Sequence, residues 1–238
     1  MIDGKLHHFT YTALYDGLAV MQDKETKTLW DHITGEAMYG PLVGHNLGHV
    51  SNLLQMNVRQ ALALDPKMPI AISDRGYFVG DRQFGSAPGF LGGRGSERWA
   101  PNNPNAQLTA PFVQSLGTED TRRPRMDMGL GVWTDVTHRY YPMELLHARG
   151  DALVDRIDGQ NLLVYVEPES ATPAAMFVAA QSATVDGNDV RLDDGTIVRS
   201  GRLLGRDGKA QKIERPLQIF TRWYGFALTF PGCEIADR

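Results

Sequence analysis

The sequence predicts a mainly β protein of the α+β class, in which antiparallel sheets are covered by two helices and interrupted by a long irregular lid. Short runs of alternating apolar residues, separated by Asp-Gly and similar turns, recur in the first and last parts of the chain and indicate strands. Two longer apolar runs have helical spacing instead. The chain has 238 residues, of which 42% are hydrophobic, so it can bury a substantial core as a single domain.

The first expected element is an antiparallel strand pair near the start of the chain. Leu6–Tyr11 is expected to form one strand, and Leu18–Gln22 can pair with it. Asp16–Gly17 lies between them and is a good two-residue hairpin turn. Because successive side chains of a strand point to opposite faces, His7 and His8 are expected on different sides of this sheet.

The next stretch predicts a second hairpin with a bent exit. A polar turn at Asp23–Lys27 separates Leu18–Gln22 from the apolar pair Leu29–Trp30. A second turn follows at Thr34–Glu36, and Tyr39–Pro41 then bends the chain. This second hairpin carries more local information than any other stretch of the sequence.

Two segments are predicted to be helices that pack against each other. Apolar residues follow helical spacing through Asn46–Leu64, with Asn46 as the expected cap. They do so again in Pro216–Phe230, where a broad apolar face indicates a buried side. After the first helix, Pro69–Ser73 is expected to form a short strand.

Residues 74–128 are expected to form the lid. Glycine, proline and asparagine accumulate there and periodicity disappears, and connections of such length are usually functional or disordered. Regular structure then resumes, and Pro142 is expected to begin a short helix. The strands expected in this last part, with hairpin turns between them, are Gly129–Thr134, Ala152–Ile157, Asn161–Val166, Ala174–Ala180, Val190–Leu192 and Thr196–Val198.

A faint internal repeat divides the chain into two halves. When Leu54–Ala71 is aligned with Ile219–Ala236, a proline, an isoleucine and an alanine of the two segments coincide. We therefore expect one domain over residues 1–238, with half-repeats 1–73 and 129–238 on either side of the lid. Each half would be a small antiparallel sheet, followed by a helix that covers it and by a strand that begins with a proline.

Charge and composition exclude several classes of protein. The net charge of -4 and the pI near 6.0 argue against a protein that binds nucleic acid. No apolar run approaches the roughly 20 residues of a membrane-spanning helix, so we expect a soluble chain with no membrane span. Cys233 is the only cysteine, which excludes an intrachain disulfide and a CxxC redox or zinc motif. The oligomeric state is left open, a homo-oligomer included.

The second hairpin also carries a recognisable pattern. The pattern consists of Met21, Asp23, Glu25-Thr26, Leu29-Trp30, Thr34-Gly35-Glu36-Ala37, Gly40-Pro41-Leu42, Gly44 and Leu47. It resembles the signature of the bacterial Domain of Unknown Function 3179 family. The resemblance covers about half of the chain in patches, and its second part consists of Glu119-Asp120, Arg122, Gly129, Gly131-Val132 and Tyr141-Pro142.

This resemblance implies a mostly β, two-lobed domain from bacterial proteins that are often exported or membrane-attached. It implies no established reaction. Many members of that family carry a cysteine-containing segment upstream of the signature, which points to thiol redox or metal chemistry in those proteins. Because Cys233 stands alone, this sequence offers no such cysteine pair.

Histidines are the candidate metal ligands. His45 and His49 have the i, i+4 spacing that places two imidazoles on one face of a zinc-binding helix, although no glutamate follows His45. In the hairpins, His32 can join His7 or His8 if their strands are neighbours. Three imidazoles suit zinc, copper or iron, so a transition-metal cofactor is one expectation. The other interpretation is that each of these is an ordinary polar or structural histidine.

The lid supplies a different signal, because its cations are all arginines. Between Arg75 and Arg125 there are seven arginines and four acids, which gives a local charge of 7 − 4 = +3. Planar guanidinium groups suit a carboxylate or a phosphate, so Arg94, Arg98, Arg122 and Arg125 are candidate ligands of a small anionic molecule. The other interpretation is that these arginines pair with nearby acids and loop carbonyls.

Two functional hypotheses follow, and no catalytic constellation decides between them. The first is a small-molecule ligand-binding or interaction domain whose ligand is an anion held under the lid. The second is a histidine-ligated, metal-dependent enzyme, with redox chemistry as one option. If the protein carries out chemistry, we expect it where the second hairpin meets the lid, with His32 as the first residue to test.

Overall fold

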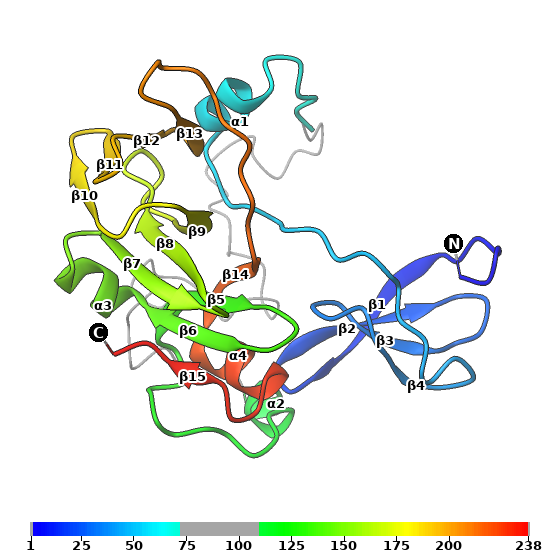
Figure 1. Cartoon of the computed structure of the whole chain (residues 1–238). Coiled ribbons are helices and arrows are strands. Elements are labelled where there is room, and N and C mark those ends of the chain that lie inside the picture. Colours follow the sequence, from blue (N-terminus) through cyan, green and yellow to red (C-terminus); the bar gives the residue numbers. More distant parts are fainter. Residues whose placement is uncertain (1, 72–109, 238) are drawn as a thin grey trace, which may run out of the picture.

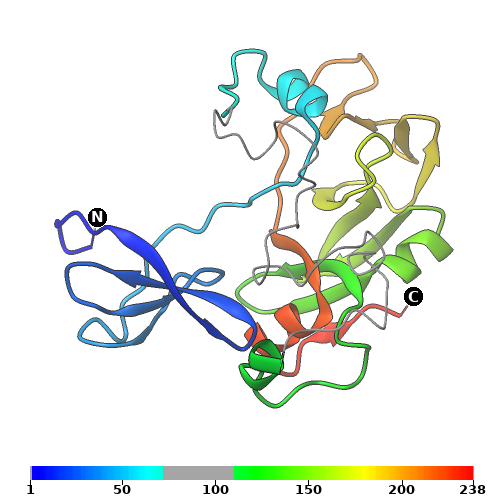
Figure 2. The same cartoon turned by 180° about the vertical axis from the view of Figure 1, so that it is seen from behind.

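The computed structural model describes residues 2–71 and 110–237. This part of the chain is mainly β, as predicted, with four sheets and short helices. One four-stranded sheet near the N-terminus projects from a larger body that holds the other three sheets (Figure 1). The view from behind shows the same arrangement, and the chain that follows the projecting sheet crosses to the far end of the body (Figure 2).

The projecting sheet, called the N-terminal sheet below, is an antiparallel meander. Its strands, in order, are β1 (Phe9–Tyr15), β2 (Leu18–Asp23), β3 (Leu29–Asp31) and β4 (Ala37–Tyr39). The predicted turn between the first two strands is confirmed, since Asp16 and Gly17 have φ values of 51° and 69°, as a tight hairpin turn requires. The first strand begins at Phe9 rather than at the predicted Leu6, so both histidines of that segment precede it.

The N-terminal sheet has a small core of its own. Ile2, Trp30 and Ala37 are buried together, and Met21 and Leu42 pack against them. Every residue of β1 is exposed. So small a core stabilises a sheet only weakly, and the polar contacts of its turns therefore carry more of its stability than is usual.

The larger body contains three sheets. The central sheet consists, in order, of β14 (Leu217–Arg222), β5 (Met128–Trp133), β6 (His138–Pro142) and β15 (Glu234–Ile235), and β15 runs parallel to β6. The second is the meander β7 (Ala152–Ile157), β8 (Gln160–Val166) and β9 (Pro173–Val178). The third is the meander β10 (Ala183–Asp186), β11 (Asp189–Leu192), β12 (Ile197–Arg199) and β13 (Arg202–Leu204). The strands predicted for this part of the chain are confirmed to within two residues at each end.

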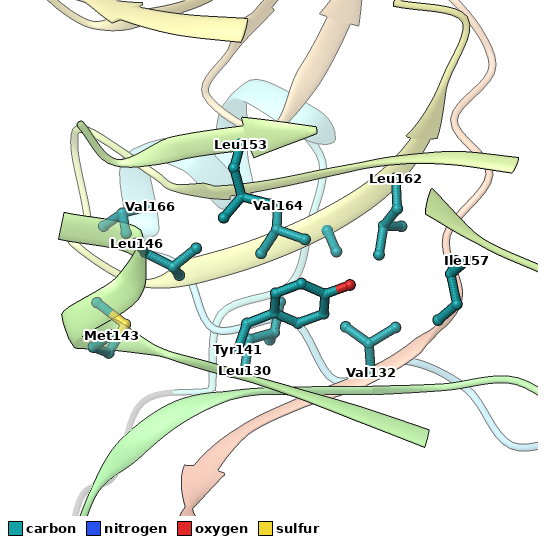
Figure 3. Packing of buried hydrophobic residues seen from close by; sticks show 11 residues of the cluster. Leu130, Val132, Tyr141, Met143, Leu146, Leu153, Ile157, Leu162, Val164 and Val166 are labelled. Carbon is teal, nitrogen blue, oxygen red and sulfur yellow. The ribbon is translucent and has the colours of Figure 1, made fainter. Parts of the chain in front are cut away.

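The main core lies between the central sheet and the β7–β9 sheet (Figure 3). Leu130 and Val132 of β5 are buried together with Leu162 of β8. Tyr141 of β6 lies among them and donates its hydroxyl to Oδ2 of Asp155 at 2.8 Å. A second core packs the β7–β9 sheet against the β10–β13 sheet, so the middle sheet is covered on both faces.

The helices are α1 (Val58–Leu64), α2 (Ala110–Gln114), α3 (Met143–Ala148) and α4 (Trp223–Thr229). As predicted, α3 follows Pro142, which occupies the N-cap position without a capping hydrogen bond and has no N–H to leave unsatisfied. α2 and the turns before β5 belong to the predicted lid, whose residues 74–109 lie outside the described part of the chain. None of the described helices is long and apolar enough to cross a membrane.

The first predicted helix is wrong in its N-terminal half. α1 begins only at Val58, where Asn57 caps it and exchanges two hydrogen bonds with Gln60 in a capping box. The expected cap, Asn46, instead accepts the N–H of Gly48 at 2.8 Å. Gly48 has a φ of 87°, which does not fit a helix, so the chain stays extended up to the true cap.

The second predicted helix is wrong in its first half. Leu217–Arg222 pairs along its whole length with β5 as strand β14, and Trp223–Thr229 is helical. α1 and α4 lie at opposite ends of the body in both views, so the predicted packing of the two helices is also wrong (Figures 1 and 2). Of the predicted strand Pro69–Ser73, residues 69–71 form no strand and the rest lies outside the described residues. The half-repeats stay a prediction.

Candidate functional site

The polar turn of the second hairpin is built around the carboxylate of Asp23, at the end of β2. Oδ1 accepts the backbone N–H of Thr26 at 2.5 Å, and Oδ2 accepts the indole N–H of Trp30 at 3.0 Å. The hydroxyl of Thr26 donates to Oδ2 at 2.7 Å, and the N–H of Thr28 lies 3.2 Å from the same oxygen. The carboxylate is fully buried, so these donors replace its water shell.

The pKa of Asp23 follows from these contacts. Burial alone would raise the pKa, but the hydrogen bonds from Trp30 and Thr26, together with the neighbouring His7, outweigh burial and hold the pKa well below its usual range. Asp23 is therefore an anion at neutral and mildly acidic pH. The N-terminal sheet holds a permanent negative charge next to its small core.

His7 lies against this charge. Its Nδ1 is 3.3 Å from Oδ1 of Asp23, and its side chain is only 5% exposed. Within the described residues this nitrogen is buried without a hydrogen-bond partner. Nearby, Glu25 binds His8 twice, through Nδ1 at 2.7 Å and the backbone N–H at 2.9 Å, and these contacts lower the pKa of Glu25 to about 2.

Together these side chains form a cluster with the composition of a metal site. The ligand atoms of His7, Asp23 and Glu25 all lie within 4.8 Å of one another. Two donor atoms 3.3 Å apart subtend about 104° at an ion placed about 2.1 Å from each, close to the tetrahedral angle that zinc prefers. His8 would then orient Glu25 from outside the site, as partners of metal ligands commonly do.

The remaining predicted histidines lie elsewhere. Nε2 of His45 is 3.4 Å from Oδ2 of Asp3, and its Nδ1 is 3.1 Å from the carbonyl of Leu42. His49 is exposed in the extended segment before α1, so the two no longer share a helix face. The sequence reasoning missed the two acids of the cluster, although both stand in the polar turn just after β2.

A groove of about 360 Å³ lies where the N-terminal sheet meets α4, and we call it the hairpin–helix groove. The tip of the first hairpin fits tightly into this junction. A Cβ on Gly17 would lie 2.7 Å from Leu116 and 2.9 Å from Tyr224. From the next turn, Ile33 packs in one cluster with Trp223. The junction therefore positions the two walls of the groove relative to each other.

The polar lining of the hairpin–helix groove is acidic. It contains Asp16, Asp31 and Glu36, together with His32. Oδ1 of Asp31 accepts two N–H groups of its own turn, at 2.6 and 3.1 Å, and Oδ1 of Asp16 accepts the N–H of Gly117 at 2.8 Å. Gly117 belongs to the last part of the predicted lid. The structure therefore places His32 in the same groove as Asp16, the residue of the first hairpin that binds the lid.

Comparison with known protein families gives a match. A family described as "Protein of unknown function (DUF3179)" matches residues 2–231 of the chain. The chain belongs to the DUF3179 family. No curated protein and no solved structure matches it. The signature residues Asp23, Thr26 and Trp30 of this DUF3179 chain are the ones that join the buried carboxylate to its donors, so a structural role accounts for them.

Two of the arginines predicted to bind an anion are engaged by carboxylates in the DUF3179 chain. Nη2 of Arg122 donates to Asp120 at 2.6 Å and to the carbonyl of Cys233 at 2.9 Å, and its guanidinium stacks over Trp223. Arg125 donates to Glu119 at 2.7 Å. Arg94 and Arg98 lie outside the described residues.

The single thiol of this DUF3179 chain is buried. Cys233 packs in the cluster that contains Trp223 and Phe230. Burial raises its pKa to about 11, so the thiol stays protonated at neutral pH. A protonated, buried thiol is a poor nucleophile and a poor metal ligand, which fits a packing role.

Proposed function

We propose that this DUF3179 domain binds a small molecule with a cationic group in the hairpin–helix groove. The observation that supports this most directly is a groove of about 360 Å³ whose polar lining contains three carboxylates and one histidine. Its volume falls in the range of about 300–1,000 Å³ that is usual for small-ligand sites. Leu18, Val20, Leu228 and Pro231 give it apolar surface for the remainder of such a ligand.

The charge of the ligand differs from the one that the arginines predict. Arg122 and Arg125 are each matched by a carboxylate, and the anionic ligand remains a prediction that now depends on Arg94 and Arg98. The groove carries the opposite charge, since Asp16, Asp31 and Glu36 exceed its single histidine. Electrostatic attraction therefore favours an amine or another cation there.

Two probes of similar size and opposite charge test this function. Putrescine and succinate both have four carbons, and we expect putrescine to raise the melting temperature of the wild-type protein while succinate leaves it unchanged. Replacing Glu36 by Gln removes one exposed charge of the groove and should weaken putrescine binding about fivefold by isothermal titration calorimetry.

Glu144→Gln is the matched control, because Glu144 is 84% exposed and lies on α3, away from the groove. It should bind putrescine like the wild type. Stabilisation by succinate alone would contradict the cationic ligand and support the anionic one. Equal binding by Glu36→Gln and the wild type would show that the groove is not the site.

A second candidate function is metal binding, and the cluster of His7, Asp23 and Glu25 is the observation that favours it. His7 presents a buried nitrogen without a partner among the described residues, next to a permanent anion. A nitrogen and two carboxylate oxygens suit zinc or another first-row transition metal. An ion held there would supply Lewis-acid or, for a redox metal, electron-transfer chemistry, in line with the enzyme that the histidines predicted.

Zinc stoichiometry tests the second function. We expect the wild-type protein to retain about one zinc ion per chain after dialysis against zinc and removal of the excess, and His7→Ala to retain none, because the histidine is the single nitrogen ligand of the cluster. His147→Ala is the control, since His147 is an exposed histidine that also pairs with an aspartate. Equal zinc content in both variants would exclude this site.

A further inference from the structure

The first strand of the N-terminal sheet is an open edge. β1 pairs with β2 along one side, and no strand of the described chain pairs with its other side. All seven of its residues are exposed, and the sheet that carries it projects from the larger body (Figures 1 and 2). The N–H and C=O groups of such an edge can pair with a further strand, so a free edge is a template for association.

The sequence of β1 does nothing to block this pairing. The strand reads FTYTALY, with no charged residue and no proline. Its large apolar side chains are Phe9, Tyr11, Leu14 and Tyr15, and each is between 37% and 59% exposed. A bulge at Thr12 bends the strand and leaves a pairing segment on either side of it. β1 therefore offers apolar side chains together with its backbone groups.

The other edge strands of the described sheets are protected. β4 has only three residues and is followed by Gly40–Pro41. The strands β7, β10, β13, β14 and β15 each contain an aspartate, a glutamate or an arginine. β9 is uncharged, but the N–H of Phe177 donates to the carbonyl of Glu214 at 2.9 Å. Proteins commonly protect edges in these ways, so the exposed, uncharged β1 indicates a partner strand.

A second copy of this chain fits the open edge. Antiparallel pairing of β1 with its own copy about a two-fold axis is self-complementary, and it places the Phe9 end of one strand opposite the Tyr15 end of the other. Apolar side chains then lie across from apolar side chains, which stabilises paired strands. The two four-stranded sheets join into one, whose new edges are the two short β4 strands. Association therefore stops at two chains.

The charges at the two ends of the N-terminal sheet favour the same arrangement. The meander brings Lys5 and Lys24 to one end, where both are exposed and make no ion pair in the described part of the chain. Each carboxylate at this end lies against a histidine; these are Asp3, Asp23 and Glu25. Asp16, Asp31 and Glu36 lie at the other end. A two-fold axis places the lysines of one copy near the acids of the other, and such complementarity favours one orientation of the partner.

We propose that two copies of this chain associate through antiparallel pairing of their β1 strands. Two paired strands of seven residues bury less than the about 1,200 Å² at which stable interfaces begin. The association is therefore weak, with an expected Kd of roughly 10–100 µM. It goes beyond ligand binding in the hairpin–helix groove, because Tyr11, near the middle of the strand, does not line that groove.

Concentration-dependent association of the full chain tests the proposal. Sedimentation velocity from about 1 µM to about 1 mM should show a monomer that converts to a dimer, with half conversion near the expected Kd. Hydrogen exchange measured by mass spectrometry identifies the face that pairs. Amides of residues 9–15 should exchange more slowly in the dimer than in the monomer, whereas those of β4 should not change. This comparison uses the wild-type chain alone, so it does not depend on any variant folding.

A pair of tyrosine substitutions supplies a matched comparison. Tyr11→Lys places a charge near the two-fold axis of the paired strands and should weaken the dimer at least about tenfold. Tyr39→Lys is the control, because Tyr39 is 72% exposed and lies on β4, the other edge of the same sheet. It should form dimers like the wild type. Tyr11→Lys should still bind putrescine like the wild type, which separates the dimer from the ligand site.

Three results would overturn the proposal. The first is a wild-type chain that stays monomeric up to about 1 mM, well above the expected Kd. The second is a dimer in which residues 9–15 exchange as fast as in the monomer, which would place the interface on another face. The third is equal association by the wild type and a Tyr11→Lys variant that circular dichroism shows to be folded.

Discussion

Asp23→Ala unfolds the N-terminal sheet while the larger body stays folded. The substitution leaves the indole N–H of Trp30 and the N–H groups of Thr26 and Thr28 without their common acceptor. A buried donor left without its acceptor costs about 1–3 kcal/mol of folding free energy, and three donors lose their acceptor here. The sheet has only the small core around Trp30 to offset this loss. We therefore expect the lost free energy to exceed the stability of the sheet.

Hydrogen exchange measured by mass spectrometry distinguishes local from global unfolding. In Asp23→Ala, amides of residues 9–39 should lose protection, while those of β5 and β8 keep it. Asp186→Ala is a matched control, because Asp186 also ends a strand before a turn but is 66% exposed and pairs with Arg191 at the surface. It should change stability by less than about 0.5 kcal/mol. Normal protection of residues 9–39 in Asp23→Ala would contradict the structural role given to this carboxylate.

The same contacts predict how the stability of the N-terminal sheet depends on pH. The folded-state pKa of Asp23 lies well below the unfolded value of about 3.9, so its contribution is fully present above that value. The contribution is lost as pH falls toward the folded pKa. We therefore expect protection of residues 9–39 to fall below about pH 4 in the wild type, while that of β5 and β8 persists to lower pH.

Gly131→Ala destabilises the larger body by about 3 kcal/mol, because the added methyl group meets a fixed aromatic ring. Gly131 lies in the middle of β5, and a Cβ there would lie 2.1 Å from Cδ2 and 2.3 Å from Cε2 of Phe226 on α4. The ring is buried and packs against Tyr140 and Phe230, so it has no free space to enter. Overpacking of this kind typically costs about 1–3 kcal/mol, and a clash with a fixed ring lies at the upper end.

A double-mutant cycle with Phe226→Ala isolates this contact. Phe226→Ala alone should cost about 3–5 kcal/mol as a buried aromatic. The double variant should cost less than the sum of the two single variants, because the ring that clashes is gone. Urea unfolding followed by tryptophan fluorescence provides the free energies. Additive losses would show that the clash is not what excludes a side chain at Gly131.

Gly225→Ala is the control, because Gly225 lies on α4 next to Phe226. A Cβ there would lie 3.1 Å from the hydroxyl of Thr221, and the change from glycine to alanine favours the helix by about 1 kcal/mol. We expect a much smaller effect than at Gly131. Because α4 forms one wall of the hairpin–helix groove, Gly131→Ala should also weaken putrescine binding, whereas Gly225→Ala should affect it far less.

Turns were predictable from the sequence because their chemistry is local. Asp16 and Gly17 accept positive φ values more easily than other residues, and they form the predicted hairpin. The two predicted helices show where local information fails. Residues 217–222 have apolar positions that suit either a helix or a strand, and pairing with β5 selects the strand.

The candidate sites were predictable only in part. His7 and His8 were predicted as ligands by their type, and the structure supplies the acids that lie against them. The burial of Glu167 has no sequence signal of its own, because an isolated Glu-Pro-Glu turn does not reveal which oxygens are buried. That depends on α1 and on the β12–β13 turn, which come from distant parts of the chain.

The sequence by itself determined the mainly β class, the hairpin turns, the family signature and the absence of a cysteine pair. These depend on residue type and on spacing over a few positions. Only the tertiary structure decided which segments pair as strands, where α4 and the N-terminal sheet leave a groove, and which carboxylates lose their water. Those outcomes depend on burial and on contacts between residues far apart in the chain, which no local pattern records.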